Sequence, residues 1–365
     1  MALAMSDAGA REGAGGIQPE PEPRLKTERL KSAGVGSVAG MARAVELLRA
    51  GGTVAFPTET VYGLAANAMD PVAVAKVFAA KQRPGWDPVI VHVEGAAMLE
   101  RVAAVPAELR DRAQALMEAF WPGPLTLLLP RTAEVPDAVT AGRLLVGVRM
   151  PAHPVARELI RMADLPLAAP SANRFGAPSP TTAAHVLADL AGRIDAVLDG
   201  GPTTVGVEST VLDLAARAIY RPGAVSAAMI SRVIGDEVRV VGAADFPGAA
   251  APEGLPSPGM GMRHYAPRAR LVLVESQQQM LEEIAKHPAA EVGVMQPDDW
   301  DRGAAEVLFR WGPWGDAETL ARLLYFGLRN LDERGAKVIV CPVPAMSGGL
   351  GEALRDRLEK AARVG

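Results

Sequence analysis

Short apolar runs alternate with amphipathic helical patterns along residues 37–239. Segments with the length and composition of buried strands are residues 53–56, 89–93, 125–129, 145–150, 167–170, 196–199 and 209–214. Apolar positions recur at helical spacing in 37–50, 71–83 and 106–120, and Thr181 or Thr182 can cap a further helix. Because several connections contain no helix, the pattern predicts an α/β fold with a mixed, twisted sheet and flanking helices.

A second and smaller α/β pattern follows a stretch in which the periodicity fails. Residues 240–267 are rich in Gly, Ala, Pro and Ser, which predicts a linker. Beyond them, apolar runs at 271–274, 292–295 and 338–341 alternate with helical patterns at 320–334 and 351–362. We therefore expect a flexible tail over 1–36, a larger domain over 37–239, the linker over 240–267 and a C-terminal domain over 268–365.

Composition and charge exclude several classes of protein. The chain has 365 residues, with 49% hydrophobic and only 4% aromatic, and its net charge of −4 gives no overall electrostatic argument for nucleic acid. The single cysteine, Cys341, lies in an apolar run and predicts a buried strand residue. No apolar run approaches the roughly 18 residues that cross a bilayer, and the first residues lack the apolar stretch of a signal peptide. We expect a cytoplasmic protein with no membrane contact.

Polar side chains gather where the predicted strands end, which is where open α/β sheets carry their sites. Pro57 should end the strand at 53–56, and a run of hydroxyls with one carboxylate, Thr58-Glu59-Thr60, follows it directly. Arg149 closes an apolar strand, an unusual position for a cation unless it faces a cavity. Taken alone, the first of these clusters could be an ordinary polar turn.

Further candidates repeat the pattern of hydroxyls, glycines and cations. Lys81 and Arg83 end a predicted helix, where cations also serve simply to complement the helix C-terminus. Ser171-Ala172-Asn173 follows another strand, and Arg221 lies near the segment 207–210 and the glycines at 200–201. Close backbone approach, donors and positive charge suit a phosphate-bearing ligand. The chain has no P-loop, dinucleotide fingerprint, nucleophile elbow or metal-ligand spacing of histidines, so residue chemistry alone predicts an α/β protein that binds a small anionic ligand.

Taken together, the motifs resemble the Sua5/YciO/YrdC family in its two-domain Sua5 form. The matching segments, in family order, are Phe56–Leu64, Lys81–Pro84, Pro88–Val93, Trp121–Thr126, Val146–Pro151, Ala169–Asn173, Val207–Thr210, Arg221–Gly223, Ser257–Met260, His264–Pro267, Gly349–Leu354, Arg357–Leu358 and Lys360–Ala362. The resemblance covers roughly residues 37–365 and implies a YrdC-like catalytic domain followed by a smaller Rossmann-like α/β domain. It also implies an enzyme, a nucleotidyltransferase that condenses L-threonine, bicarbonate and ATP to threonylcarbamoyl-AMP and pyrophosphate.

The family's functional positions carry over onto this chain motif by motif. The resemblance implies an L-threonine pocket of Thr58, Thr60, Tyr62, His92, Arg149 and Ser209. It implies ATP contacts from Lys81, Arg83, Asp87, Leu145, Ala169, Ser171, Asn173, Ser179, Arg221 and Tyr265. Lys81, Arg83, Arg149 and Arg221 would carry the catalytic charge stabilisation, together with Mg²⁺ on the ATP. Asp87 stands where the family usually has Asn, and it would face phosphates unfavourably unless a cation intervenes.

The resemblance also implies partners and leaves rival readings open. The product would pass to a threonylcarbamoyl transferase complex for the t6A modification of tRNA, with possible contact to tRNA itself. One alternative is a carbamoyltransferase that forms carbamoyl-adenylate, and another is a non-catalytic module that binds double-stranded RNA. The linker, ending in His264 and Tyr265, is expected to act as a lid over the neighbouring domain.

Overall fold

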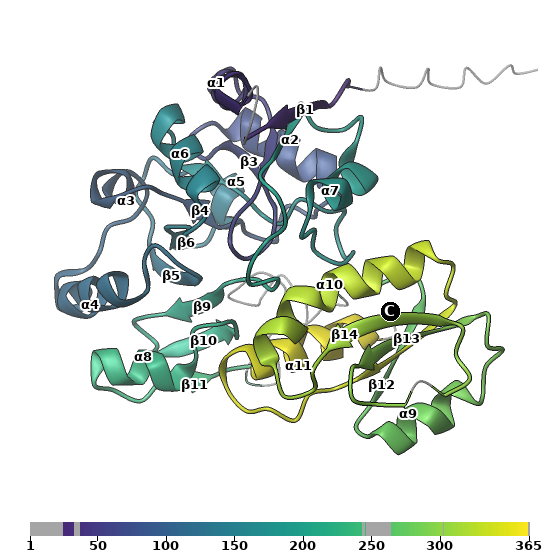
Figure 1. Cartoon of the computed structure of the whole chain (residues 1–365). Helices are drawn as coiled ribbons and strands as arrows, with labels where there is room; N and C mark the ends of the chain where they lie inside the picture. Colours follow the sequence, from purple (N-terminus) through teal and green to yellow (C-terminus); the bar gives the residue numbers. More distant parts are fainter. Residues whose placement is uncertain (1–24, 33–36, 243–244, 246–263, 302, 364–365) are drawn as a thin grey trace, which may run out of the picture.

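The structure is a computed structural model of the whole chain, and it describes residues 25–32, 37–242, 245, 264–301 and 303–363. Two sheets organise these residues (Figure 1). The larger sheet has eleven strands in the order β1-β8-β2-β3-β7-β4-β6-β5-β9-β10-β11, and the smaller has four in the order β12-β15-β13-β14. The predicted α/β fold with a mixed sheet and a smaller second domain is confirmed.

The larger sheet combines parallel and antiparallel pairs. Strand β2 pairs antiparallel with β3 and parallel with β8, and β6 pairs parallel with β4 and antiparallel with β5. In sheet order its strands are β1 (Glu28–Lys31), β8 (Ala196–Asp199), β2 (Val54–Phe56), β3 (Gly63–Asn67), β7 (Leu167–Ala168), β4 (Val91–His92), β6 (Leu145–Arg149), β5 (Leu125–Pro130), β9 (Thr210–Asp213), β10 (Ala218–Arg221) and β11 (Arg239–Val240). As expected from its missing N–H, Pro57 follows the last residue of β2.

Helices cover this sheet and bury its apolar side chains. They are α1 (Ser37–Arg49), α2 (Pro71–Lys81), α3 (Ala96–Val102), α4 (Arg110–Phe120) after a 3₁₀ turn (Ala107–Leu109), α5 (Asp137–Thr140), α6 (Pro154–Ala163), α7 (Ala183–Leu190) and α8 (Ala227–Ile234). The start of α2 shows how the sequence fixes such a helix: Asp70 accepts from the amides of Val72 and Ala73, and Pro71 occupies the first position. Thr182 caps α7 in the same way, as predicted.

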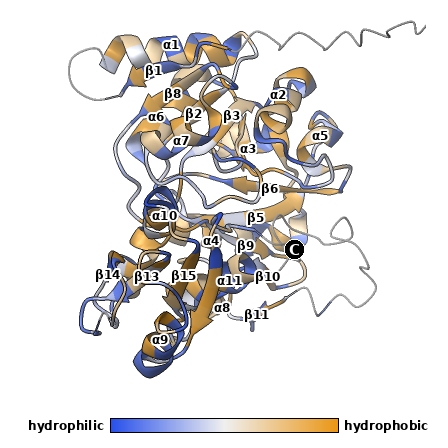
Figure 2. Ribbon diagram, turned by 90° about the vertical axis from the view of Figure 1, so that its right-hand side faces the viewer, coloured by the Kyte–Doolittle hydropathy of each residue, from blue (hydrophilic) through white to orange (hydrophobic). Residues whose placement is uncertain are grey.

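The C-terminal domain is a parallel sheet with associated helices. Its elements are β12 (Arg270–Val274), α9 (Gln277–Ile284), β13 (Val292–Pro297), β14 (Val307–Gly312), α10 (Ala317–Glu333), β15 (Val338–Pro342) and α11 (Gly349–Ala362). Helix α9 connects β12 to β13, and α10 connects β14 to β15. All three pairings within the sheet are parallel, and Cys341 is buried in β15 as predicted. In Figure 2 hydrophobic residues (orange) follow the strands, whereas the outlying helix α9 carries much of the hydrophilic blue.

The prediction of a flexible N-terminal tail over residues 1–36 is wrong for part of that range. Residues 28–31 form strand β1, which pairs parallel with β8 at the edge of the sheet. The segment Glu-Arg-Leu-Lys is polar because an edge strand exposes alternate residues to solvent, and this polarity hid it from the hydrophobic pattern. The remainder of the expected tail, residues 1–24 and 33–36, lies outside the described residues, as do 243–244 and 246–263 of the expected linker.

Candidate active site

A pocket opens where several strand ends of the larger sheet meet residues from the end of the expected linker. Most of the site residues inferred from the sequence line it: Thr58, Thr60, Arg83, Asp87, His92, Arg149, Ala169, Ser171, Ser209, Arg221 and Tyr265. They come from segments spread over 200 residues, brought together because strands β2, β4, β6, β7, β9 and β10 all begin or end at this place.

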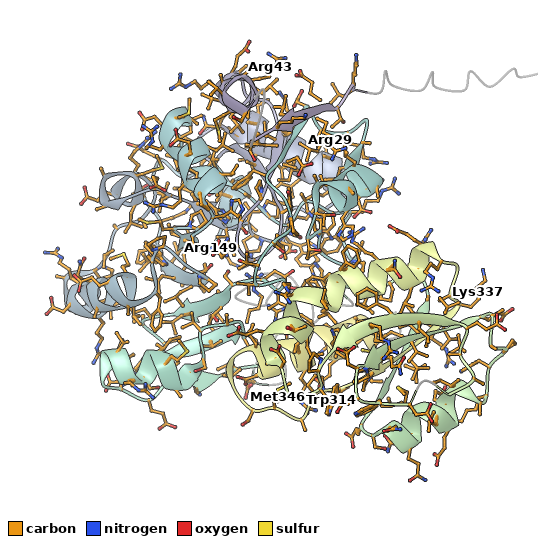
Figure 3. All side chains as sticks on the ribbon, in the orientation of Figure 1. Arg29, Arg43, Arg149, Trp314, Lys337 and Met346 are labelled. Atoms are coloured by element: carbon orange, nitrogen blue, oxygen red, sulfur yellow. The ribbon has the colours of Figure 1, made fainter. Side chains whose placement is uncertain are left out.

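Arg149 stands among hydroxyl groups at the end of β6. Its side chain is buried, and Nη1 donates to Thr60 Oγ1 (3.0 Å). The Thr58 and Thr60 hydroxyls lie 2.8 Å apart, and Thr58 Oγ1 donates to Val61 O at 2.6 Å. Thr60 is therefore left to donate to Thr58 while it accepts from Arg149. Figure 3 places Arg149 inside the larger domain, as expected for a strand-end cation that faces a cavity.

Glu59 is the counter-charge of Arg149, and sequence reasoning did not select it. Its Oε1 lies 3.6 Å from Arg149 Nη1, and its Oε2 accepts from the amide of Ala152 at 3.0 Å. Burial lowers the pKa of Arg149, and the Glu59 carboxylate opposes that shift. Among the described residues Arg149 Nε has no hydrogen-bond partner. The arginine thus keeps donor capacity for a ligand, and a carboxylate is the group that its planar fork suits.

His92 lies in the same wall and is held neutral. Burial, and secondly the charge of Arg149, keeps the pKa of the imidazole well below its usual range. Its Nδ1 is buried and has no partner within the described part of the chain. A neutral imidazole beside a buried arginine can accept a hydrogen bond from an amine without adding positive charge.

Two further arginines line the same pocket. Arg221 donates from Nε to Ser209 O (3.0 Å) and from Nη2 to Ser209 Oγ (3.1 Å), and the Ser209 hydroxyl lies 2.8 Å from that of Thr126. Arg83 forms a buried ion pair with Asp87 at 2.9 Å and also donates to the carbonyls of Asp87 and Pro88.

The ion pair with Arg83 shows how the carboxylate of Asp87 is neutralised beside a pocket suited to an anionic ligand. Burial raises the pKa of Asp87, and the charges of Arg83 and Lys81 lower it. The cation that has to intervene between this carboxylate and an anionic ligand is therefore Arg83 itself. Asp87 still lines the pocket, so it reduces the positive charge offered there.

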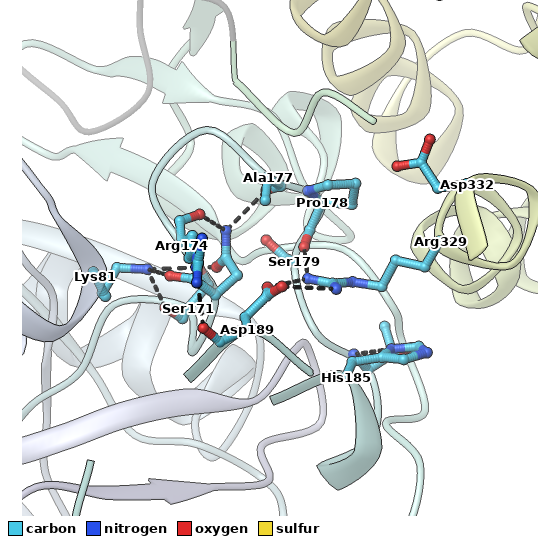
Figure 4. Close-up of polar contacts among 12 residues, drawn as sticks. Lys81, Ser171, Arg174, Ala177, Pro178, Ser179, His185, Asp189, Arg329 and Asp332 are labelled. Carbon is cyan, nitrogen blue, oxygen red and sulfur yellow. Dashed lines mark hydrogen bonds and ion pairs between the residues drawn. The ribbon is translucent and has the colours of Figure 1, made fainter. Parts of the chain in front are cut away.

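Five of the inferred residues lie behind the pocket wall instead of lining it: Tyr62, Lys81, Leu145, Asn173 and Ser179. The Lys81 ammonium is buried and donates to the carbonyl oxygens of Ser171 and Asn173, so it holds the loop after β7 (Figure 4). Burial lowers its pKa well below the usual lysine range.

The other four residues also have partners or positions elsewhere. Tyr62 donates to Gly201 O (2.7 Å), and Asn173 Nδ2 donates to the carbonyls of Arg174 and Ala177. Ser179 donates to Glu208 at 2.5 Å. Leu145 lines a separate hollow beside β5 and β6. None of these four side chains therefore lines the pocket in this structure.

Two acidic residues and a histidine of the site were missed by the sequence reasoning. Glu59 and Glu208 lie inside the quoted motifs, and Glu208 and His264 line the pocket. Glu59 stands between two threonines and Glu208 directly precedes Ser209 and Thr210. A carboxylate next to hydroxyl residues in a strand-end motif was the available signal. Among the described residues no group of three or more His, Cys, Asp or Glu side chains is arranged to hold a metal ion, and no helix has the length and apolarity to cross a membrane.

Comparisons with known proteins match both domains of the chain. A family model described as "Telomere recombination", for Sua5, YciO and YrdC proteins, matches residues 46–223, and one described as "Threonylcarbamoyl-AMP synthase, C-terminal domain" matches residues 225–363. The threonylcarbamoyl-AMP synthase of Pyrococcus abyssi is 42% identical over 87% of this chain and 93% of its own. That of Bacillus subtilis is 43% identical over 88% of this chain and 92% of its own.

A solved structure extends the match to three dimensions. The crystal structure of P. abyssi Sua5 complexed with L-threonine superposes with a TM-score of 0.83 at 40% identity, covering 92% of this chain and 97% of that one. The fold of both domains is therefore shared with a protein solved in complex with L-threonine. The chain belongs to the Sua5/YciO/YrdC family, in its two-domain Sua5 form.

Proposed function

We propose that this protein is an L-threonylcarbamoyladenylate synthase, an enzyme that condenses L-threonine, bicarbonate or CO₂ and ATP to threonylcarbamoyl-AMP and pyrophosphate. One observation carries the proposal: a single pocket is lined by a buried arginine among hydroxyls, which suits a carboxylate, and by two further arginines, which suit phosphates. The names of the P. abyssi and B. subtilis relatives and the threonine complex of the former support it.

The threonine half of the site would be built on Arg149. Its guanidinium would bind the amino-acid carboxylate bidentately, with Thr58, Thr60 and Ser209 offering hydroxyls to the remaining polar atoms. His92, neutral and unpartnered at Nδ1, would accept from the threonine ammonium. Such contacts orient the amine toward the centre of the pocket.

The ATP half would use the charges and backbone of the other wall. Arg83 and Arg221 would offset the charge that develops on the phosphates, while Ala169 and Ser171 offer backbone groups and shape to the nucleoside. Tyr265, buried at the pocket edge, would stack on or bond to the nucleotide. Lys81, Asn173 and Ser179 support this wall from behind by holding the loop after β7 and Glu208.

The reaction needs no covalent enzyme intermediate. The threonine ammonium loses one proton to give the free amine, and bicarbonate takes up a proton and loses water to give CO₂. The amine attacks the carbon of CO₂, and the adduct releases a second proton to become the carbamate. A carbamate oxygen then attacks the α-phosphorus of ATP, the bond to the bridging oxygen breaks, and pyrophosphate leaves with that electron pair. This second step is a nucleotidyl transfer, and it can run on positioning and charge stabilisation. Burial of the site would protect the mixed anhydride from water until a transferase complex uses it for tRNA.

A protein-held metal does not fit the acidic residues of the described pocket. Asp87 is paired with Arg83, and Glu208 accepts from Arg357, Tyr325 and Ser179, so neither has a full set of oxygens to offer a hard cation. Mg²⁺ would instead arrive on the phosphates of ATP as part of the substrate. No step above depends on a protein ligand to metal.

The test is pyrophosphate release by the full chain, measured with each substrate omitted in turn. The proposal predicts release only when ATP, bicarbonate and L-threonine are all present, with little release when serine or valine replaces threonine. Release with carbamoyl phosphate and ATP in the absence of threonine would support the carbamoyltransferase alternative instead. No release, together with tight binding of double-stranded RNA, would support the non-catalytic module.

A further inference from the structure

The C-terminal domain packs directly against the back of the candidate active site. Val61 and Tyr265, which line the pocket, belong to the same buried apolar cluster as Leu320, Leu324 and Leu358 of helices α10 and α11. Gly206, just before the motif at 207–210, has φ of +86°, and a Cβ there would collide with the backbone of α10. The two domains are therefore in close contact behind one pocket wall, where α10 and α11 face the larger domain (Figure 1).

The contact is centred on the carboxylate of Glu208, a residue of the pocket wall. Its Oε1 accepts from Ser179 Oγ at 2.5 Å, within the larger domain. Its Oε2 accepts from Tyr325 OH (2.9 Å) and from Arg357 Nε (3.0 Å), which both belong to the C-terminal domain. All these groups are buried, so each bond replaces water that the carboxylate has lost.

Arg357 also holds the backbone of two segments that carry pocket residues. Its Nη1 donates to Pro222 O (2.9 Å), and its Nη2 donates to Glu208 O at 3.4 Å. Glu208 and Pro222 are the chain neighbours of Ser209 and Arg221, which bond to each other inside the pocket. One guanidinium therefore ties the two segments together from behind, while Ser209 and Arg221 join them from the front.

Neighbouring positive charges keep the Glu208 carboxylate ionised. Burial raises the pKa of Glu208, but Arg357, Arg221 and the Ser179 hydroxyl outweigh it and hold the pKa at about 2. The Arg357 guanidinium also lies over the ring of Tyr265, 5.4 Å from its centroid, and Tyr325 packs on the same ring at 5.6 Å. The two C-terminal residues thus support both Glu208 and Tyr265 of the pocket wall.

We propose that Arg357 and Tyr325 are positioning residues that act through Glu208 to set the spacing between Ser209 and Arg221. This inference rests on the proposed function, since it assigns Ser209 to the threonine half and Arg221 to the phosphates. The C-terminal domain then completes the active site without touching substrate. The sequence of that domain contains no clustered phosphate- or carboxylate-binding groups, and this role requires none.

The chain offers a matched control at a second buried ion pair between the domains. Arg329 of α10 pairs with Asp189 of α7 at 2.6 Å and also donates to Pro178 O (Figure 4). Asp189→Asn removes this charge pair with little change of shape and leaves the bond to Pro178 in place. It therefore reports what loss of any interdomain ion pair does to the enzyme.

The experiment compares Arg357→Lys, Tyr325→Phe and Asp189→Asn in the full chain. Arg357→Lys keeps the charge but loses the fork that reaches Glu208 and Pro222 together. We expect it to lower kcat/KM for ATP at least tenfold and to weaken ATP binding by calorimetry to a similar extent. The KM for threonine should rise less than the KM for ATP, because Ser209 is the one member of the threonine half held by this cluster and Arg149 keeps its own contacts. Asp189→Asn should leave all three quantities within twofold at a comparable loss of thermal stability.

A double-mutant cycle makes the route through Glu208 explicit. Tyr325→Phe should lower kcat/KM for ATP several-fold alone, yet add less than twofold in a Glu208→Gln background. Effects that multiply would overturn the proposal, as would ATP binding by folded Arg357→Lys equal to that by Asp189→Asn. If Arg357→Lys does not fold, the Tyr325 cycle decides. A wild type that binds ATP but makes no adenylate would refute the proposed function, and the binding comparison would still judge the positioning role.

Discussion

Replacing Arg149 by methionine tests the threonine half of the site most sharply. The change keeps a long apolar stem but removes the guanidinium that donates to Thr60 and lies 3.6 Å from Glu59. A bidentate bond between a guanidinium and a carboxylate in a buried site is worth roughly 2–3 kcal/mol. At 1.36 kcal/mol for each factor of ten, the KM for threonine should rise about 30- to 150-fold. The KM for ATP should change little, because Arg83 and Arg221 remain.

The same substitution also has a cost in stability, and this can be separated from the loss of binding. It leaves the buried Glu59 carboxylate with Oε1 unpaired, and removal of one partner from a buried pair costs about 3–5 kcal/mol. Adding Glu59→Gln removes the stranded charge and keeps an oxygen for the amide of Ala152. The double variant should therefore regain thermal stability without regaining affinity for threonine.

Steady-state kinetics with threonine and ATP varied separately, together with thermal unfolding, measure both effects. A folded Arg149→Met variant with a threonine KM within threefold of wild type would refute the carboxylate role. Recovery of threonine affinity in the double variant would show that Glu59 and the fold, not the guanidinium, determine binding.

Three further substitutions test other parts of the account. Asp87→Asn should lower the KM for ATP several-fold, because Arg83 loses its counter-charge and like-charge repulsion disappears, while chemical denaturation should show about 3 kcal/mol less stability. An unchanged KM would mean that Arg83 does not reach the phosphates. Lys81→Met should raise the KM for ATP about tenfold, because the carbonyls of Ser171 and Asn173 lose their donor. A KM for ATP equal to that of the wild type would show that Lys81 does not hold the loop in place for ATP. Glu208→Gln should make the free energy of unfolding less dependent on pH in acid. The Glu208 pKa is about 2 in the folded protein, below the usual 4.5, so the carboxylate stabilises the fold above pH 4.5 and this stabilisation is lost as the pH falls toward 2. That shift corresponds to roughly 3 kcal/mol, and an acid unfolding curve parallel to wild type would exclude it.

Local patterns predicted much of the fold but not the strands that depend on tertiary pairing. Apolar runs such as 125–129 and 338–341 are buried strands, because their own composition favours that state. Strand β3 (Gly63–Asn67) was missed, since its Gly-Leu-Ala-Ala-Asn sequence has little β preference. It is a strand because β2 and β7 pair with it on both sides.

The same limit applies to the site. Arg149 could be recognised because a cation at the end of an apolar strand needs a reason to be there. The contacts of Arg357 and Tyr325 with Glu208 could not be predicted, because these residues lie 149 and 117 positions away from it. Arg357 stands in a segment that resembles the family, but that resemblance does not say what it touches. Their role depends on how the two domains pack, which no spacing within the sequence encodes.

The central claim is that one pocket joins threonine, bicarbonate and ATP through a carbamate. The most direct measurement is a single-turnover reaction of the full chain with ¹³C-bicarbonate, L-threonine and ATP, analysed by mass spectrometry with pyrophosphate measured in parallel. The account predicts threonylcarbamoyl-AMP that carries one ¹³C atom and one pyrophosphate for each adenylate formed. An adenylate without the label, or threonyl-AMP in its place, would contradict it.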